Sequence, residues 1–160
     1  MDLLCLGLNH QSAPVEVRER FAVSADHLGE ASKELTEMSG IEEVVVLSTC
    51  NRMEVYALTD DSNVAELSIK QYLAGGQAFD PADENHFYKR VASDAVRHLC
   101  RVVSGLDSMV LGETEIFGQV KQAYTQALES SATGGTLNKL FQKSFGVGKK
   151  VRTKTSIQNG

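Results

Sequence analysis

The sequence contains no tryptophan, only two prolines and only three cysteines among its 160 residues. The cysteines, Cys5, Cys50 and Cys100, are odd in number, widely spaced and without a CxxC pair. This pattern excludes a disulfide framework and a cysteine-rich zinc site. No apolar stretch reaches the ~18 residues of a membrane span, and residues 1–10 lack the basic start and cleavage site of a signal peptide. We therefore expect a cytoplasmic protein without membrane association.

Nucleotide-binding and metal-binding motifs are also missing. A dinucleotide-binding turn has to follow a strand, but the nearest match, Gly146-Val147-Gly148, lies in a predicted helix and lacks the third glycine. The patterns GxxxxGK[ST], HExxH and GxSxG do not occur. The motifs therefore assign no cofactor and no metal to this chain.

Charge is distributed unevenly along the sequence. The chain has 16 basic and 21 acidic residues, but the segment 136–160 has no acidic residue and the basic residues Lys139, Lys143, Lys149, Lys150, Arg152 and Lys154. A basic helix can bind nucleic-acid phosphates with release of counterions, although lysine-rich helix faces are more often simply solvated. Charge alone leaves both interpretations open.

Hydrophobic periodicity and turn residues predict a mixed fold. We expect strands at 3–9, 42–49, 52–59 and 86–91 and helices at about 24–40 and 62–75. This β-α-β-β-α-β order is typical of a ferredoxin-like unit with four antiparallel strands and helices on one face. Three more helices are expected at about 93–103, 113–129 and 137–152. The predicted class is α+β, with a ferredoxin-like subdomain over 1–91 and a helical subdomain over 92–154.

Two helices carry apolar stripes that we expect to face the core. In the helix that begins at about residue 62, the stripe consists of Val64, Leu67 and Leu73. In the helix after residue 92, the stripe consists of Val96, Leu99, Cys100 and Val103, and Ser93 is the expected N-cap.

Cys50 lies in LSTCNRMEVY, between two predicted strands where a hairpin ordinarily has Asn-Gly or Asp-Gly. Cys5 in a strand and Cys100 on an apolar helix face are expected to be small buried hydrophobic residues. Cys50 instead ends a strand among polar residues, and the cation of Arg52 would favour its thiolate. The residues alone leave a nucleophile and a merely tolerated cysteine equally open.

A second polar segment is HLCRVVSGLDSMVLGETEIFGQVK, residues 98–121. His98 lies near an apolar stripe, where a core histidine is the commoner outcome. Further along, Ser108, Glu113, Glu115 and Gln119 lie at or near the beginning of the next helix, whose N-terminus can hold an anion. First-turn acids and a turn hydroxyl would give the same pattern without any ligand.

Three stretches together resemble signature sequences of glutamyl-tRNA reductase, in the same order and with similar spacing. They are LGLNHQSAPVEVRER, LSTCNRMEVY and the block 98–121, and the resemblance extends over 3–155. It implies the N-terminal catalytic domain of an enzyme that also has a Rossmann-type NADPH-binding domain and a helical dimerisation domain. Residues 155–160 would then begin a linker to an absent nicotinamide-binding domain. Phe117 and the tail SIQNG depart from the family pattern.

The resemblance also implies a reaction. A Cys50 thiolate would displace tRNA from the glutamyl-tRNA ester, and the full-length enzyme would reduce the resulting thioester with NADPH to glutamate-1-semialdehyde, for tetrapyrrole (porphyrin) biosynthesis. His98 would assist proton transfer, and His10 matches a signature without an assigned step. The substrate-binding residues would be Thr49, Asn51, Arg52, Ser108, Glu113, Thr114, Glu115 and Gln119.

The resemblance further implies a homodimer, formed through a domain absent here, and a downstream aminomutase as a possible partner. This chain alone would bind no NADPH and would at most hydrolyse the ester. The alternative is a non-catalytic ferredoxin-like module that binds RNA or a small ligand. RNA-binding sheets stack bases on exposed aromatic residues, and Tyr56 is the one aromatic residue in the two strands that flank Cys50.

Alkylation with iodoacetamide at neutral pH distinguishes a catalytic Cys50 from an incidental one. If Cys50 is a nucleophile, we expect fast and selective alkylation of this residue, because the thiolate is the reactive form. Mass mapping of the labelled peptides measures the selectivity. Equally slow labelling of all three cysteines would favour the binding module.

Overall fold

The computed structural model describes residues 1–155, so the predicted linker lies outside the described residues apart from Thr155. The elements are β1 (Asp2–Asn9), α1 (Val15–Phe21), the 3-10 helix η1 (Ala25–His27), α2 (Leu28–Thr36), β2 (Glu43–Ser48), β3 (Arg52–Thr59), α3 (Ser62–Leu73), the 3-10 helix η2 (Pro81–His86), β4 (Tyr88–Val91), α4 (Ser93–Val103), α5 (Glu115–Glu129) and α6 (Gly135–Thr155). No described helix has both the length and the hydropathy that crossing a membrane requires.

The four strands form one antiparallel sheet in the order β2-β3-β1-β4. This is the ferredoxin-like order, so the predicted fold class is confirmed. In the register of β1 with β3, Cys5 pairs with Tyr56 and Gly7 with Glu54. Because side chains alternate between the two faces of a strand, these four residues share one face of the sheet.

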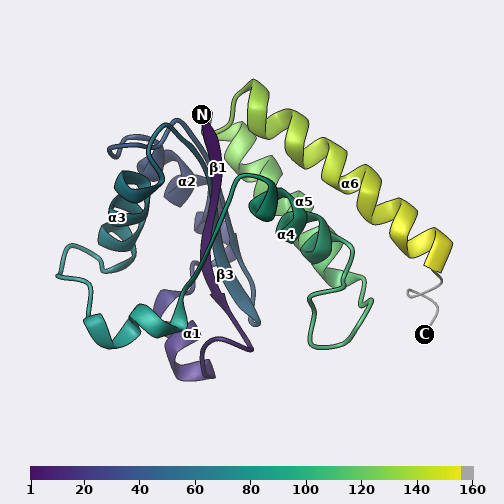
Figure 1. Ribbon diagram of the computed structural model, residues 1–160, viewed down its shortest axis with the longest axis horizontal. Helices are drawn as coiled ribbons and strands as arrows, with labels where there is room; N and C mark the ends of the chain where they lie inside the picture. Colours follow the sequence, from purple (N-terminus) through teal and green to yellow (C-terminus); the bar gives the residue numbers. More distant parts are fainter. Residues whose placement is uncertain (156–160) are drawn as a thin grey trace.

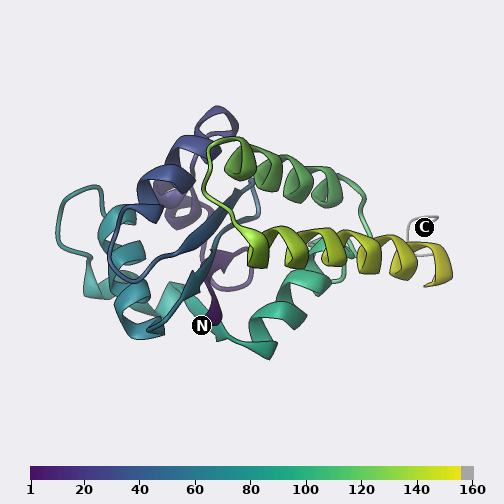
Figure 2. The ribbon, with the colours of Figure 1, turned by 90° about the horizontal axis from the view of Figure 1, so that it is seen from above.

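The helices of the ferredoxin-like unit lie on one face of this sheet, as predicted, and the later helices cover the other face. α2 and α3 pack on one face, α4 and α5 cover the other, and α6 packs across α4 and α5 (Figures 1 and 2). Every residue of β3 is buried, as expected for a central strand covered on both sides. The chain after Val91 therefore folds back to cover the second apolar face.

The predicted inward stripe of α3 is wrong for Val64 and Leu67, whereas Leu73 packs against the core as predicted. Val64 and Leu67 are 37% and 69% exposed, whereas Ala65, Ser68 and Ile69 are buried. The small side chains of Ala65 and Ser68 allow the helix to lie close to its neighbours, and the Ser68 hydroxyl donates to the Ser39 carbonyl oxygen at 2.7 Å. Packing space, rather than hydrophobicity alone, selects the buried face.

The predictions for α4 and β4 also need correction. Val96 is 37% exposed, and the buried face of α4 includes His98 beside Leu99. The N-cap is Ala92, with φ 55°, and not Ser93. β4 begins at Tyr88, because the preceding residues form η2.

An aromatic cluster joins the sheet to the later helices. Phe141 of α6 is 1% exposed. Its ring stacks on Tyr124 of α5 at 5.5 Å and meets Tyr56 of β3 edge-on at 5.7 Å. Such pairs contribute about 0.5–1.5 kcal/mol each beyond area burial. Hydrogen bonds also connect the sheet to α6, because the Glu43 carboxylate of β2 accepts from the amides of Gly134 and Leu137 at the beginning of α6.

Phe141→Ala tests whether this cluster attaches the helical layer. We expect a loss of about 3–5 kcal/mol in the free energy of unfolding, because the substitution leaves a cavity between sheet and helices. Urea denaturation measures this loss. Val147→Ala on the same helix is the control, since Val147 is 41% exposed. Equal stability of the two variants would contradict this role.

Candidate active site

The turn between β2 and β3 presents Cys50 to solvent. The amide of Thr49 donates to the Arg52 carbonyl oxygen at 2.8 Å, and the amide of Asn51 donates to the Thr49 hydroxyl at 3.2 Å. Neither Cys50 nor Asn51 is among the described residues with positive φ. The turn therefore needs no Asn-Gly pair, because the threonine side chain stabilises it.

A cavity of 320 Å³ opens beside Cys50, near the lower limit for small-molecule sites. The hairpin turn contributes Thr49, Cys50, Asn51 and Arg52. The chain around the beginning of α5 contributes Ser108, Glu113, Glu115 and Gln119, together with the exposed apolar residues Met109 and Val110. The fold thus brings together eight of the predicted site residues from two segments far apart in the sequence.

Two predicted site residues do not line this cavity. Thr114, the N-cap of α5, lies beside Phe117 and Arg152 in a separate hollow. His98 lines a different cavity, between β4 and α4, so it does not share a cavity with the Cys50 thiol that it was expected to assist.

Arg52 is 2% exposed and already has protein partners. Its guanidinium donates to a Glu54 carboxylate oxygen at 3.2 Å, and to the carbonyl and carboxylate oxygens of Asp107 at 2.7 and 3.0 Å. Burial lowers the pKa of Arg52, but the Glu54 charge and the Asp107 hydrogen bond outweigh burial and raise it above its ordinary value. Arg52 is therefore a fixed cation at the cavity wall.

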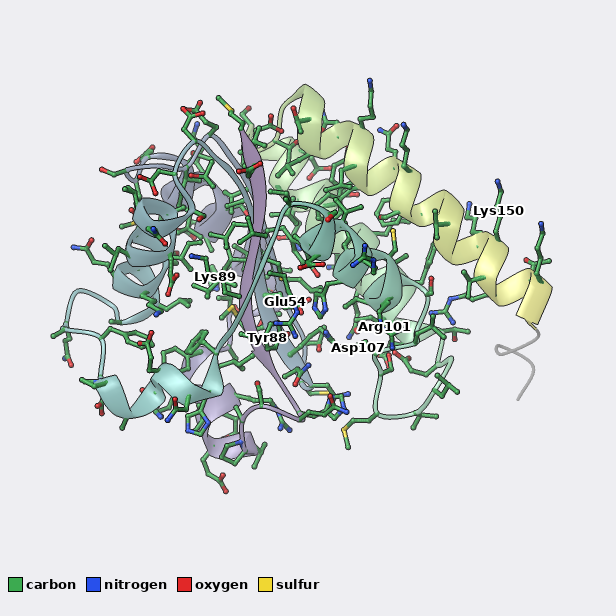
Figure 3. The ribbon with its side chains drawn as sticks, viewed as in Figure 1. Glu54, Tyr88, Lys89, Arg101, Asp107 and Lys150 are labelled. Atoms are coloured by element: carbon green, nitrogen blue, oxygen red, sulfur yellow. The ribbon has the colours of Figure 1, made fainter. Side chains whose placement is uncertain are left out.

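Glu54 is the centre of a buried polar network that the sequence analysis missed. Its carboxylate is fully buried and accepts hydrogen bonds from Arg52, Tyr56, Tyr88 and His98. Figure 3 labels two of these residues, Glu54 and Tyr88, which lie close together at the sheet. Burial raises the pKa of Glu54, but the hydrogen bond from His98 and the charge of Arg52 outweigh burial. The resulting pKa is about 2, below the ordinary value of a glutamate. Because the ionised carboxylate is an acceptor only, Nε2 of His98 is the donor.

The strand pattern did carry a signal for this network. Arg52, Glu54 and Tyr56 alternate, so they share one face of β3. This face is buried by later parts of the chain, because His98 of α4 bonds Glu54 and Phe141 of α6 packs on Tyr56. Gly7 makes room from β1, because a Cβ at this position would lie 2.8 Å from Cγ of Glu54.

The free backbone amides at the beginning of α5 are bonded to the side chain of Glu113. Glu113 accepts from the amides of Glu115 and Ile116 at 2.8 and 3.1 Å, and Ser108 donates its hydroxyl to Glu113 at 3.3 Å. The predicted anion site is thus filled by Glu113 in this structure, and the capping interpretation of the acids holds for it.

Arg152 does not belong to the basic surface predicted for α6. It is 5% exposed and donates to the carbonyl oxygens of Gly112 and Val103 at 2.9 and 3.1 Å. Burial lowers its pKa. Arg152 therefore fixes the loop that carries Ser108 and Glu113, whereas the lysines of α6 stay exposed.

A second arginine missed by the sequence analysis supports the hairpin. Arg18 of α1 donates from Nε to the Cys50 carbonyl oxygen at 3.3 Å and from Nη1 to the Ala13 carbonyl oxygen at 2.8 Å. The Cys50 backbone is therefore held from outside the sheet. No local sequence pattern connects residue 18 to residue 50.

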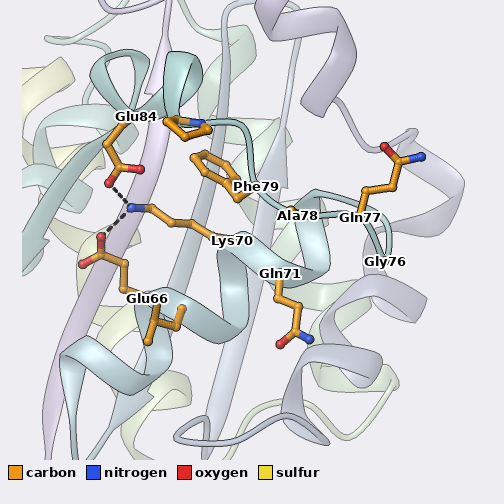
Figure 4. A pocket seen from close by; sticks show the side chains of 10 residues that line it. Glu66, Lys70, Gln71, Gly76, Gln77, Ala78, Phe79 and Glu84 are labelled. Atoms are coloured by element: carbon orange, nitrogen blue, oxygen red, sulfur yellow. Dashed lines mark hydrogen bonds and ion pairs between the residues drawn. The ribbon is translucent and has the colours of Figure 1, made fainter.

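A larger cavity, of 890 Å³, lies between α3 and the segment before β4 (Figure 4). Lys70 points into it but is paired with Glu66 at 2.7 Å and with Glu84. Its lining includes no cysteine, serine or histidine. Size alone therefore does not identify the site, and the chemistry favours the cavity at Cys50.

Comparison with known proteins identifies the family of this chain. A family model described as "Glutamyl-tRNAGlu reductase, N-terminal domain" matches residues 6–155. The chain belongs to this family. The glutamyl-tRNA reductases of Akkermansia muciniphila and Marinobacter nauticus are 50% and 51% identical to it, over 100% and 98% of this chain but 47% and 36% of those proteins.

A solved glutamyl-tRNA reductase from Methanopyrus kandleri has the same fold as this chain. It aligns with a TM-score of 0.78 and 34% identity over 95% of this chain and 34% of that one. The chain thus spans less than half the length of these glutamyl-tRNA reductases.

Phe117, which the sequence analysis gave as a departure from the family pattern, packs between helices. Its ring lies 5.7 Å from that of Phe145 on α6, and it also lines the hollow at Thr114. It does not line the Cys50 cavity. The Phe117 side chain is therefore accommodated by packing between α5 and α6.

Glu54→Gln tests the buried network. At pH 7 we expect the variant to be less stable by about 3–5 kcal/mol, because Arg52 stays buried with one carboxylate fewer. The lowered pKa means that ionised Glu54 stabilises the fold above pH 4.5 and loses this effect as the pH falls to about 2.

The stability difference between wild type and Glu54→Gln should therefore shrink over this pH range, which urea unfolding at several pH values measures. Glu19→Gln is the matched control, because Glu19 is an exposed carboxylate on α1. If Glu54→Gln behaved like Glu19→Gln at every pH, the network would not have this role.

Proposed function

We propose that this chain is the acyl-transfer part of a glutamyl-tRNA reductase and forms a thioester at Cys50. The observation that carries the proposal is the exposed thiol at a cavity lined by the hairpin turn and the beginning of α5. Cysteine suits this step because its thiolate is both a strong nucleophile and a good leaving group.

The proposed step is a transesterification. The Cys50 sulfur attacks the glutamyl carbonyl carbon, the C–S bond forms and the C–O bond to the tRNA ribose breaks. The ribose oxygen leaves with a proton, so the step needs no oxidant or reductant. The product is a glutamyl thioester on Cys50 and a free tRNA.

The other residues of the cavity would bind the glutamyl group. Arg52 would use its remaining N–H groups for a substrate carboxylate, a contact for which guanidinium geometry is suited. Thr49, Asn51 and Ser108 would hydrogen-bond the amino-acid portion or the oxyanion. Glu113, Glu115 and Gln119 would line the opposite wall, and Thr114 would contribute only after a change of the loop.

His98 would act through Glu54 rather than on the thiol. It donates to the carboxylate that holds Arg52, and its ring lies 5.4 Å from that of Tyr88. In this role His98 is a positioning residue. Proton transfer to the leaving ribose oxygen would then require a water or another group of the cavity.

The one glycine pattern that comes near a dinucleotide motif does not form a nucleotide-binding turn in this structure. The two glycines of the nearest dinucleotide pattern lie inside α6, and a Cβ on Gly148 would meet Val103 at 2.7 Å. Gly148 therefore serves the packing of α6 on α4. The hydride for glutamate-1-semialdehyde would come from NADPH bound elsewhere in the enzyme, whose dimer, aminomutase partner and cytoplasmic location are also proposals.

Cys50→Ser tests the nucleophile. We expect no covalent transfer of radioactive glutamate from glutamyl-tRNA to the variant at neutral pH, a loss of at least about 10³-fold, because a serine hydroxyl without a base is a weak nucleophile. Retention of the label on acid-precipitated protein after digestion of the tRNA with ribonuclease measures the transfer. Cys100→Ser is the control, since Cys100 lies on α4 and not at this cavity. A labelled Cys50→Ser protein would disprove the assignment.

A further inference from the structure

A second polar cavity lies beside the Cys50 site, between β4 and α4. Its volume is 490 Å³, and its lining includes Lys89, Arg90, Arg97 and Arg101 against the acids Asp94 and Asp107. The chain as a whole carries a net charge of −5. This cavity is thus a local excess of positive charge on an acidic chain, which favours an anionic ligand.

The arginines of this cavity are available for a ligand to different degrees. In the part of the chain that the structure describes, Arg101 is exposed and has no acceptor for its guanidinium. Arg90 lies over the Tyr88 ring at 5.1 Å and otherwise makes one long bond, of 3.4 Å, to its neighbour's carbonyl. Arg97 pairs with Asp94, an exposed pair that contributes little.

The remaining arginines are engaged by the protein. Arg18 and Arg152 donate to backbone carbonyls, and Arg20 is paired with Asp83. Lys89 of the cavity points away from α4 toward Glu66 and Asn63 on α3 (Figure 3). The unsatisfied guanidinium groups are therefore concentrated on the side of the cavity next to α4.

The cavity adjoins the Cys50 site through one pair of side chains. Arg52 lines the Cys50 cavity, Asp107 lines the basic cavity, and the two are bonded at 2.7 and 3.0 Å. Asp107 and Arg101 lie on the same side of α4, whereas Lys150 lies apart on α6 (Figure 3). The basic cavity therefore lies next to the Cys50 cavity, on the other side of the Arg52–Asp107 pair.

We propose that this basic cavity binds the phosphodiester backbone of the RNA end that carries the ester, with Arg101 and Arg90 as the phosphate contacts. The inference rests on the proposed function, which places an RNA ester at Cys50. Guanidinium groups suit phosphate oxygens because they donate two parallel hydrogen bonds. Neutralising phosphates would anchor the strand independently of its sequence.

Binding of deacylated tRNA tests the contact without any chemistry at Cys50. We expect Arg101→Glu to weaken binding about tenfold in fluorescence anisotropy at moderate salt. The slope of log affinity against log salt should decrease in magnitude by roughly 0.7, the value for one lost phosphate contact with a single strand. Lys33→Glu, an equal charge change at an exposed position of α2, should leave both quantities unchanged.

Transfer kinetics then distinguish this inference from the proposed function. For Arg101→Glu we expect a tenfold slower single-turnover transfer from subsaturating glutamyl-tRNA, but an unchanged rate from 2′(3′)-O-glutamyl adenosine, which has the ester and no phosphate. Arg101→Lys should restore most of the loss.

Two outcomes would overturn the inference. One is tRNA binding by Arg101→Glu equal to that of Lys33→Glu. The other is an equal loss of rate with both substrates, which would show a disturbance of the Cys50 site and not a lost phosphate. If neither substrate transferred its glutamate to the wild-type protein, the proposed function would be wrong. The tRNA-binding experiment would still decide whether Arg101 contacts a phosphate.

Discussion

The ionised carboxylate of Glu54 is the interaction on which the rest of the site depends. It is fully buried between the sheet and α4, and four donors surround it. A buried charge is tolerated only when it is paired and hydrogen-bonded. The donors come from β3, β4 and α4, so the carboxylate ties three elements together and fixes the orientation of Arg52 beside Cys50.

In this arrangement, the residues that line the Cys50 cavity are held in place by other residues behind them. Cys50 stays exposed on a turn that is held by Thr49 and by Arg18. The opposite wall is held by Arg152, which bonds the loop carbonyl of Gly112. Arg18 and Arg152, which do not line the cavity, thus hold its two walls from behind, as expected of a site whose geometry must be rigid.

The fold could be predicted from the sequence because its strands carry strong local signals, such as the apolar run of β2 and the alternation in β3. The grouping of the hairpin turn with the beginning of α5 came only through the resemblance of the chain to a family. The Glu54 network could not be predicted, because a charged residue in a strand looks solvent-exposed until a later helix covers it. For the same reason Leu67 was misplaced, since only tertiary packing shows which side of α3 has room.

The most direct measurement is a crystal structure of this chain with a glutamate thioester on Cys50. The account predicts a glutamate carboxylate within hydrogen-bond distance of the Arg52 guanidinium, while Arg52 keeps its contact with Glu54. A glutamate carboxylate bound elsewhere in the cavity, with Arg52 hydrogen-bonded only to Glu54 and Asp107, would contradict it.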